Sequence, residues 1–319
     1  MKPIFFKFRN WLRLFLTGTF FDRRSAWQAF PAFFEAAGET SFPIPGLEQV
    51  SSLNLSQQVE RCSAMTPQGM TLTEKYLLIS AYCHDHQHHS VIYVLDRNSG
   101  RKIKTVILPD LPHAGGLAYD PQQQKIWLSN SSGKHAAVAA LSLAEIEAYS
   151  EAGPPIAYQQ KVGLKELPRA SALTYDHGYL VVASFVLRGF GQIICYPLDP
   201  AGNLFNPRNG SLIQSPYGSL KLPTKIQGVT FYQNYLLLAQ SWGNQPGKII
   251  IFDIQTTSDF SDLTQASQIL TTPPYLEQIY VAEEQLLVLF ESGATAYRKK
   301  TPHVMKEVLQ LDLNKLLKP

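Results

Sequence analysis

Residues 226–241, IQGVTFYQNYLLLAQS, contain an alternating apolar strand, a tight turn at Gln233-Asn234 and a second strand rich in leucine. Two such strands, joined by residues that tolerate left-handed backbone, are typical of a β-hairpin. The pattern occurs four more times, as PQGMTLTEKYLLISAY from Pro67, AGGLAYDPQQQKIWLSN from Ala114, ASALTYDHGYLVVASF from Ala170 and LEQIYVAEEQLLVLFES from Leu276. A chain that repeats one hairpin in this way favours a repeat architecture.

The spacing of the five hairpins indicates which architecture it is. The positions equivalent to Gln227 are Gln68, Gly115, Ser171 and Glu277, and successive positions are separated by 47, 56, 56 and 50 residues. Each unit also offers two further strands, such as GKIIIFDI and ASQILTTPP in the fourth unit. Four strands in a unit of this length are typical of a propeller blade. The sequence therefore predicts an all-β fold, a β-propeller of about five four-stranded blades.

The two ends of the chain decide how the ring closes. The tail EVLQLDL, residues 307–313, alternates apolar and polar side chains and is a candidate for the outer strand of the fifth blade, with residues 48–56 as a locking strand. A sixth, degenerate blade built from both termini is the alternative. We favour five blades because the hairpin occurs five times. The chain then divides into an N-terminal helical extension, residues 1–45, and a propeller domain, residues 46–319.

The N-terminal segment combines basic and apolar residues. Residues 11–21, WLRLFLTGTFF, are interrupted by Arg13 and fall short of the roughly 20 apolar residues that span a bilayer. Three interpretations stay open: two helices at about 5–17 and 25–37 packed on the propeller, peripheral membrane contact through residues 1–37, and a cleaved secretory signal. We expect a cytoplasmic or membrane-peripheral protein rather than a secreted one.

The charge of the chain excludes one class of partner. The 319 residues carry a formal net charge of +3, and much of it comes from lysine and arginine in the first 24 residues. A nucleic-acid-binding domain usually shows a strongly basic face. We therefore expect no nucleic-acid partner, and the composition leaves the oligomeric state open.

Residues that face the channel carry the main functional hints. In a propeller the first strand of each blade lines the central channel, so equivalent positions form rings. Two residues before the ring of Gln68 lies a second ring, which reads Thr66, His113, Arg169, Lys225 and Tyr275. His113, Arg169 and Lys225 on three adjacent blades predict a site for a carboxylate or phosphate at the channel mouth. The alternative is that all three are loop residues that point to solvent.

The inner ring adds hydrogen-bonding groups and one acid. Gln68, Ser171 and Gln227 can bind the same ligand, together with Tyr275. Glu277 is the only carboxylate in this ring, and with Gln68 and Gln227 it offers the oxygen ligands that calcium prefers. The alternatives are an ion pair between Glu277 and one of the basic residues, or a polar channel lining that binds ordered water.

The run Cys83-His84-Asp85-His86-Gln87-His88-His89 is rich in ligands for zinc or copper, and a solvated loop is the alternative. The chain has three cysteines, Cys62, Cys83 and Cys195, and none lies in a CxxC pair. Two interpretations fit this pattern: three free thiols without a function, or a disulfide bond between Cys62 and Cys83.

Aromatic residues follow the inner hairpins of the third and fourth units. Phe185, Phe190 and Trp242, together with Arg188, are candidates for a rim that stacks on a sugar or another planar ligand. Packing between blades is the alternative. The sequence contains no nucleophile elbow, P-loop, dinucleotide-binding fingerprint or HExxH motif.

The inner-strand motifs QGM, GGLAYD, SALTYD, QGVTFY and LEQIYV, with AQSWG and LFESG at the ends of the last two hairpins, resemble those of bacterial propeller proteins in the gluconolactonase and strictosidine-synthase-like group. The resemblance covers about residues 64–313. It implies calcium in the channel, held by Glu, Asn and Asp side chains, and a metal that polarises a lactone or ester carbonyl. Glu277 is the one matching carboxylate, and Gln or Ser stands where Asn and Asp are expected, which departs from the group's pattern.

Three functions are compatible with these observations. The first is binding of a small anionic ligand by His113, Arg169 and Lys225. The second is calcium-dependent hydrolysis of a lactone or ester, with Glu277 as a metal ligand and His113 as general base. The third is a protein-interaction scaffold at a membrane surface. The sequence leaves open whether the protein is an enzyme.

Overall fold

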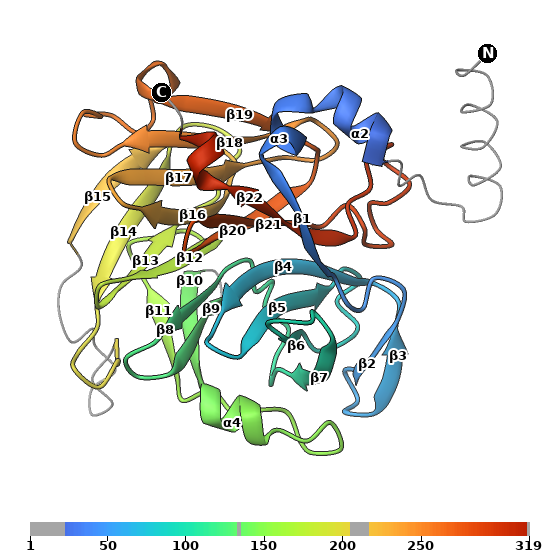
Figure 1. Ribbon diagram of the computed structural model, residues 1–319. Helices are drawn as coiled ribbons and strands as arrows, with labels where there is room; N and C mark the ends of the chain where they lie inside the picture. The colour runs from blue at the N-terminus through green and yellow to red at the C-terminus, as the bar shows by residue number, and fades with distance from the viewer. Residues whose placement is uncertain (1–22, 133–134, 205–216, 318–319) are drawn as a thin grey trace, which may run out of the picture.

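Each predicted hairpin forms the two inner strands of a separate four-stranded antiparallel sheet. The computed structural model describes residues 23–132, 135–204 and 217–317, and in that part of the chain five such sheets surround a common axis (Figure 1). The protein is therefore a five-bladed β-propeller, which confirms the predicted fold. The alternative of a sixth blade is wrong for the described residues, because both chain ends contribute to the fifth.

The first four blades follow the chain in order, from the innermost strand outward. Blade 1 contains β4 (Met65–Leu72), β5 (Tyr76–Cys83), β6 (Val91–Asp96) and β7 (Lys102–Ile107). Blade 2 contains β8 (Leu117–Asp120), β9 (Lys125–Ser132), β10 (His135–Ser142) and β11 (Gln160–Leu164). Blade 3 contains β12 (Ala172–Asp176), β13 (Tyr179–Ala183), β14 (Gly191–Pro197) and β15 (Tyr217–Leu222). Blade 4 contains β16 (Ile226–Tyr232), β17 (Tyr235–Gln240), β18 (Gly247–Asp253) and β19 (Gln268–Thr272).

Blade 5 closes the ring with strands from both ends of the chain. From the axis outward it contains β20 (Leu276–Ala282), β21 (Gln285–Phe290), β22 (Glu307–Asp312) and β1 (Ala37–Pro43). β1 pairs antiparallel with β22, so residues that we assigned to the N-terminal extension form the outermost strand of this blade. The innermost strands contact one another in the order β4, β8, β12, β16, β20 and back to β4.

The locking strand predicted at residues 48–56 is wrong. β2 (Val50–Leu53) pairs with β3 (Val59–Cys62) in a separate two-stranded sheet beside blade 1. The cause is local, because Asn54 Oδ1 accepts hydrogen bonds from the backbone N–H groups of Ser56 and Gln58, both at 2.9 Å. An asparagine side chain that binds the backbone in this way fixes a turn, so the segment folds back on itself. The EVLQLDL tail, likewise, supplies the third strand of blade 5 and not the outer one.

Two short helices, α2 (Arg23–Ala29) and α3 (Pro31–Ala36), precede β1 and pack on the core shared by blades 4 and 5. Phe33 of α3 is fully buried, and its ring meets Phe290 edge-on with 5.9 Å between centroids. The predicted helical segment at 25–37 is confirmed, with a break before Pro31, whereas the predicted helix at 5–17 lies outside the described residues. Among the helices that the structure describes, none is long and apolar enough to cross a membrane.

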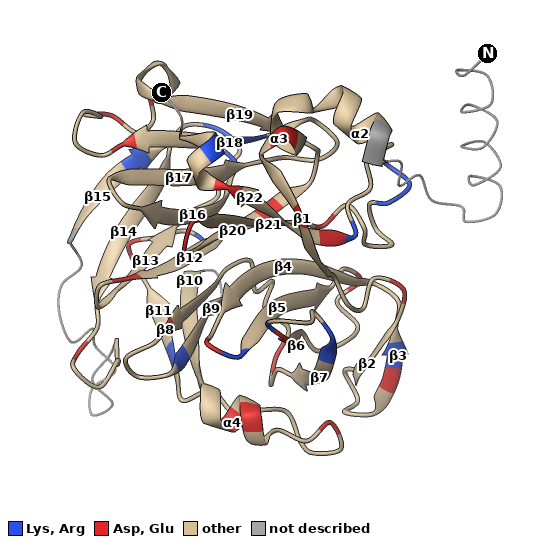
Figure 2. Ribbon diagram, in the orientation of Figure 1, with Lys and Arg blue, Asp and Glu red and all other residues tan. Residues whose placement is uncertain are grey.

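The hydrophobic core is divided among the interfaces between neighbouring blades. Each interface buries a cluster of aliphatic and aromatic side chains, and the cluster between blades 2 and 3 contains the fully buried Trp127 and Tyr196. The remaining helices are short: α4 (Leu143–Ala148) connects β10 to β11, η1 (Leu263–Gln265) connects β18 to β19, and α5 (Leu313–Leu316) follows β22. Acidic and basic residues are interspersed over the visible blades (Figure 2), in keeping with the small net charge.

Candidate ligand site at the channel mouth

Irregular strand pairing turns three predicted side chains toward the channel. The register between the two inner strands shifts in blades 1, 4 and 5. The residues within these bulges include Gln68, Gln227 and Glu277. A β-bulge re-aims side chains and is common beside functional sites. The inner ring that the sequence predicts is therefore built by the same backbone irregularity in three blades.

Gln278 closes the channel at its centre. Its Oε1 accepts hydrogen bonds from the backbone N–H of Met70 at 2.6 Å and of Leu117 at 3.0 Å. Its Nε2 donates to the backbone oxygens of Leu117 at 2.8 Å and Leu173 at 3.4 Å. The side chain thus reaches from blade 5 to blades 1, 2 and 3, and the residue is only 1% exposed.

Small residues at the equivalent positions of the other blades make room for this glutamine; they are Gly69, Gly116, Ala172 and Gly228. A Cβ atom on Gly116 would lie 2.5 Å from the backbone nitrogen of Leu173, closer than real Cβ atoms approach. The inner strands therefore come close enough for one long side chain to fill the axis.

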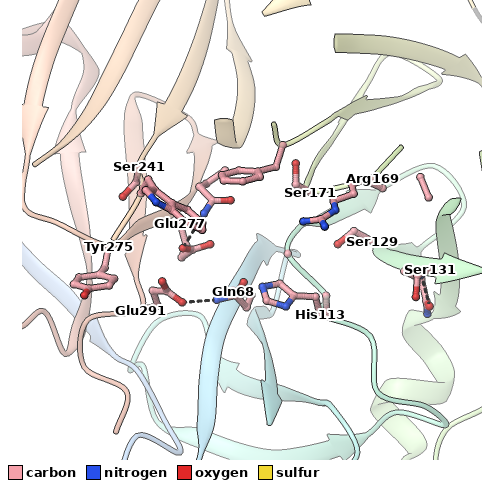
Figure 3. A pocket seen from close by; sticks show the side chains of 18 of the residues that line it. Gln68, His113, Ser129, Ser131, Arg169, Ser171, Ser241, Tyr275, Glu277 and Glu291 are labelled. Carbon is pink, nitrogen blue, oxygen red and sulfur yellow. Dashed lines mark hydrogen bonds between the residues drawn. The ribbon is translucent and has the colours of Figure 1, made fainter. Parts of the chain in front are cut away.

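A cavity of about 920 Å³ lies at the end of the channel where the inner strands begin, and Figure 3 shows side chains of its wall. A volume of this size suits a small molecule. The cavity wall contains most of the predicted site residues: Gln68, His113, Arg169, Ser171, Gln227, Tyr275 and Glu277. Lys225 does not belong to the wall that the described residues form. Its backbone N–H donates to Val186 O at 2.9 Å and its carbonyl accepts from the N–H of Ser241 at 3.0 Å, so its backbone links blades 3 and 4.

A second buried glutamate, Glu291, pairs with Glu277 in the wall. The two carboxyl groups are hydrogen-bonded to each other. Gln68 Nε2 donates to Glu291 Oε2 at 2.8 Å, and Gln227 Nε2 donates to Glu277 Oε1 at 3.3 Å. Burial, together with the charge of Glu291, raises the pKa of Glu277 well above its usual range, and burial raises the pKa of Glu291 to about 8. The pair therefore holds at least one proton at neutral pH and can donate as well as accept hydrogen bonds.

Basic side chains face the cavity at two places. Arg169 and His113 lie across the cavity from the carboxyl pair (Figure 3). The ring of His113 is open to the cavity but lies deep in the protein, and this burial, with the nearby His86, His84 and Arg169, lowers its pKa to about 4. His113 is thus a neutral imidazole at pH 7, not a cation.

Lys300 is the second cation of the wall. Its Nζ lies 5.1 Å from the ring centroid of Tyr297. Arg169 and Lys300 are both exposed to solvent, and neither forms an ion pair within the described ranges. The cavity therefore presents two positive groups that are available to a ligand.

Two aromatic pairs complete the wall. Tyr275 stacks on Tyr297 with 4.8 Å between ring centroids, and Phe185 packs at 5.4 Å against Trp242, which is half exposed. Phe185 and Trp242 are thus brought together as predicted for the rim. Phe190, which lies next to Lys221, and Arg188 do not belong to the described wall.

The sequence does not predict Glu291, Tyr297 or Lys300 in the cavity wall. It also does not predict that Gln278 closes the channel. Glu291 had a detectable signal, because it follows the second strand of its hairpin at the position of Ser131, Phe185 and Ser241, which also line the cavity. Tyr297 and Lys300 lie between β21 and β22, outside the repeat, so no ring of equivalent positions predicts them.

The histidine-rich loop sends its side chains in two directions. His84 Nδ1 lies 3.1 Å from the hydroxyl of Tyr82 and 3.5 Å from that of Tyr297, at the edge of the cavity. His88 Nδ1 lies 3.5 Å from Cys83 Sγ, on the side of the β2–β3 hairpin. The seven residues therefore do not act as one set of metal ligands.

Comparison with known proteins assigns the chain to no family. No protein family and no curated protein matches the chain. Similar solved structures include a chain of a nidogen/laminin complex, with 15% identity, a TM-score of 0.44 and coverage of 78% of this chain and 84% of that one. The PQQ-bound aldose sugar dehydrogenase of Streptomyces coelicolor has 16% identity, a TM-score of 0.43 and coverage of 81% of this chain and 80% of that one. TolB of Acinetobacter baumannii has 13% identity, a TM-score of 0.39 and coverage of 85% of this chain and 63% of that one. The resemblance to the gluconolactonase and strictosidine-synthase-like group is not confirmed by these matches.

Proposed function

We propose that the cavity binds a small hydroxylated organic anion. The observation that carries this proposal is the combination of two cations without ion-pair partners in the described structure, Arg169 and Lys300, with a carboxyl pair that holds a proton. A carboxylate or phosphate group can bind the cations through charge-assisted hydrogen bonds. Because Glu277 and Glu291 retain a proton, they repel an anion less than two ionised carboxylates would.

The other residues of the wall suit the uncharged part of such a ligand. Gln68 and Gln227 each direct Nε2 to a glutamate, which leaves Oε1 to accept a hydrogen bond from a ligand hydroxyl. The hydroxyl of Ser171 lies in the same ring. Trp242 and Phe185 provide flat apolar surface on which a sugar ring can pack. A sugar acid or a sugar phosphate contains the groups that all these side chains recognise.

Replacing the two cations tests the proposal. We expect Arg169→Ala and Lys300→Ala each to weaken binding of sugar acids or sugar phosphates by about 10- to 100-fold, because a hydrogen bond to a charged group contributes about 1.5–3 kcal/mol. Calorimetric titration with sugar acids, sugar phosphates and neutral sugars of the same size measures the change. Lys299→Ala is the matched control, since Lys299 is exposed beside Lys300 but outside the cavity wall. Equal affinity for neutral sugars and their acids, or unchanged affinity in both variants, contradicts the proposal.

A second candidate function is calcium-dependent hydrolysis of a lactone or ester. Glu291 favours it, because the two carboxyl groups and the Oε1 atoms of Gln68 and Gln227 together form a set of oxygen ligands of the kind that calcium prefers. The set fits calcium only when the carboxyl pair is ionised, so the ion and the shared proton compete. Calcium bound there would polarise a carbonyl group, and the neutral imidazole of His113 can accept a proton.

This candidate predicts calcium binding that depends strongly on pH. We expect about one ion per chain at about pH 8.5 and much weaker binding at about pH 6.5, with proton release on binding. Equilibrium dialysis measures the stoichiometry, and Glu277→Gln should lose the ion while the exposed Glu283→Gln retains it. Metal-free protein after dialysis against calcium at the higher pH excludes the hydrolase and leaves anion binding unaffected.

A further inference from the structure

A second cluster of reactive side chains lies outside the cavity, between the β2–β3 hairpin and blade 1. It contains Cys62 from β3, Cys83 from the end of β5 and His88 from the loop that follows. Both cysteines are free thiols and are 1% and 2% exposed, respectively, and the side chain of His88 is 14% exposed. Three potential metal ligands from separate segments therefore meet in an almost closed space.

Two of the distances in this cluster are close to those between ligand atoms around a tetrahedral metal ion. The sulfur atoms of Cys62 and Cys83 are 3.5 Å apart, and Cys83 Sγ is 3.5 Å from His88 Nδ1. All three ligand atoms lie within 4.8 Å of one another. Zinc–sulfur bonds of about 2.3 Å and zinc–nitrogen bonds of about 2.0 Å, at tetrahedral angles, separate two sulfurs by about 3.8 Å and a sulfur from a nitrogen by about 3.5 Å. One ion fits after small side-chain movements.

We propose that Cys62, Cys83 and His88 bind one Zn²⁺ ion, with water at the fourth position. Two thiolates and an imidazole bind zinc in preference to calcium or magnesium. Binding forms two zinc–sulfur bonds and one zinc–nitrogen bond, and both thiol protons are released to solvent. No electron is transferred, so the site needs no oxidant or reductant.

The second nitrogen of His88 supports this assignment. His88 Nε2 is buried without a hydrogen-bond partner in the described part of the chain, and it lies 3.7 Å from Oε2 of Glu60. When Nδ1 binds the metal, Nε2 carries the proton and points toward this carboxylate. Glu60 is about half exposed and can approach by rotation of its side chain. A carboxylate in this position orients a metal-bound imidazole.

A zinc ion here would fix the hairpin and the histidine-rich loop together. Direct contacts between the two segments include a hydrogen bond from the N–H of His89 to Leu53 O and one from Ser52 Oγ to His89 O, both 2.8 Å long. The same loop carries His84, which contacts the hydroxyls of Tyr82 and Tyr297 at the cavity. The proposed ion therefore holds these two segments together beside one edge of the cavity wall, without belonging to that wall.

Metal titration of the reduced, chelator-treated full chain tests the proposal. We expect uptake of one zinc ion per chain, release of two protons and a higher unfolding temperature, because a ligand that binds only the folded state stabilises it. Cobalt in place of zinc should give thiolate-to-cobalt charge-transfer absorption and the intense visible bands of a tetrahedral ion. This spectrum of the wild-type protein reports thiolate ligation without any variant.

Variants then assign the ligands. Cys62→Ser and His88→Gln should each lower zinc affinity at least 10-fold, and Cys62→Ser should also reduce the cobalt charge-transfer absorption. Two matched controls should bind as the wild type: Cys195→Ser, whose thiol lies on β14, and His86→Gln, whose ring lies beside Tyr82 in the same loop. The proposal is overturned if the reduced wild type takes up no zinc, if cobalt gives no charge-transfer band, or if a Cys62–Cys83 disulfide persists and the reduced thiols still bind no metal.

Discussion

Replacing Gln278 by leucine is expected to lower the free energy of unfolding by about 3–5 kcal/mol. Leucine keeps a side chain of similar volume but removes four hydrogen bonds to the backbone of β4, β8 and β12. The N–H groups of Met70 and Leu117 then lose their partner at a closed axis, and each buried unsatisfied group costs about 1–3 kcal/mol. Urea unfolding, followed by circular dichroism, measures the loss.

The matched control for this experiment is Gln285→Leu. Gln285 begins β21 in the same hairpin, is half buried, and its side chain bonds to no axial strand within the described structure. We expect a change within about 0.5 kcal/mol for this variant, as for most substitutions away from the core. If Gln278→Leu is no more destabilising than Gln285→Leu, Gln278 does not hold the blades together.

The carboxyl pair is expected to make the protein less stable as pH rises toward 8. Glu291 has a usual pKa of 4.5 that is raised to about 8 in the folded state. Between these values the unfolded chain has lost a proton that the folded protein retains, so the free energy of unfolding falls with increasing pH. Above about pH 8 the folded protein ionises as well, and the contribution of Glu291 stays constant.

Replacing Glu291 by glutamine should remove the part of the pH dependence of the free energy of unfolding that comes from this one proton. Relative to the wild type, the variant should gain about 1.4 kcal/mol per pH unit, or on the order of 3 kcal/mol between about pH 5.5 and 7.5. Comparing the two proteins cancels the titration of groups that both share. His113 has the opposite effect, because its pKa is lowered in the folded protein: it reduces the stability of both proteins as pH falls below about 6.5, its usual pKa.

Thermal and urea unfolding across this pH range provide the measurement, and Glu283→Gln is the control. Glu283 lies on the turn of the same hairpin with its side chain 85% exposed. Its variant should follow the wild-type curve. Parallel curves for wild type and Glu291→Gln would show that the pair does not hold an extra proton in the folded protein. The proposal that the two glutamates do not repel an anionic ligand would then fail.

The blades could be predicted from the sequence because the pattern that defines them is local. Each inner hairpin contains both of its strands and its turn within about 17 residues, so the alternation of apolar residues suffices. Ring closure could not be predicted in the same way. The pairing of Phe42 with Val308 joins opposite ends of the chain, and a short strand of the composition AGETSFP has no pattern that identifies its partner.

The candidate site was predictable where it follows the repeat and not elsewhere. Gln68, Ser171 and Gln227 occupy equivalent positions, and the propeller geometry brings such positions together. Lys225 occupies the position equivalent to Arg169 and Tyr275, but it does not belong to the cavity wall that the described residues form. Lys300, and not Lys225, is the second cation of the cavity wall. It lies in a loop between β21 and β22 whose path the sequence does not predict.

Ring closure by β1 also has a consequence for synthesis of the chain. Pro43 and Glu307 are partners in the outer ladder of blade 5 but lie 264 residues apart. At a ribosomal rate of about 5–20 residues per second, β1 emerges tens of seconds before β22 exists. The first four blades contain their strands consecutively and can form during this time. β1 remains an unpaired edge throughout, so the nascent protein must keep one strand away from other chains until its last blade is translated.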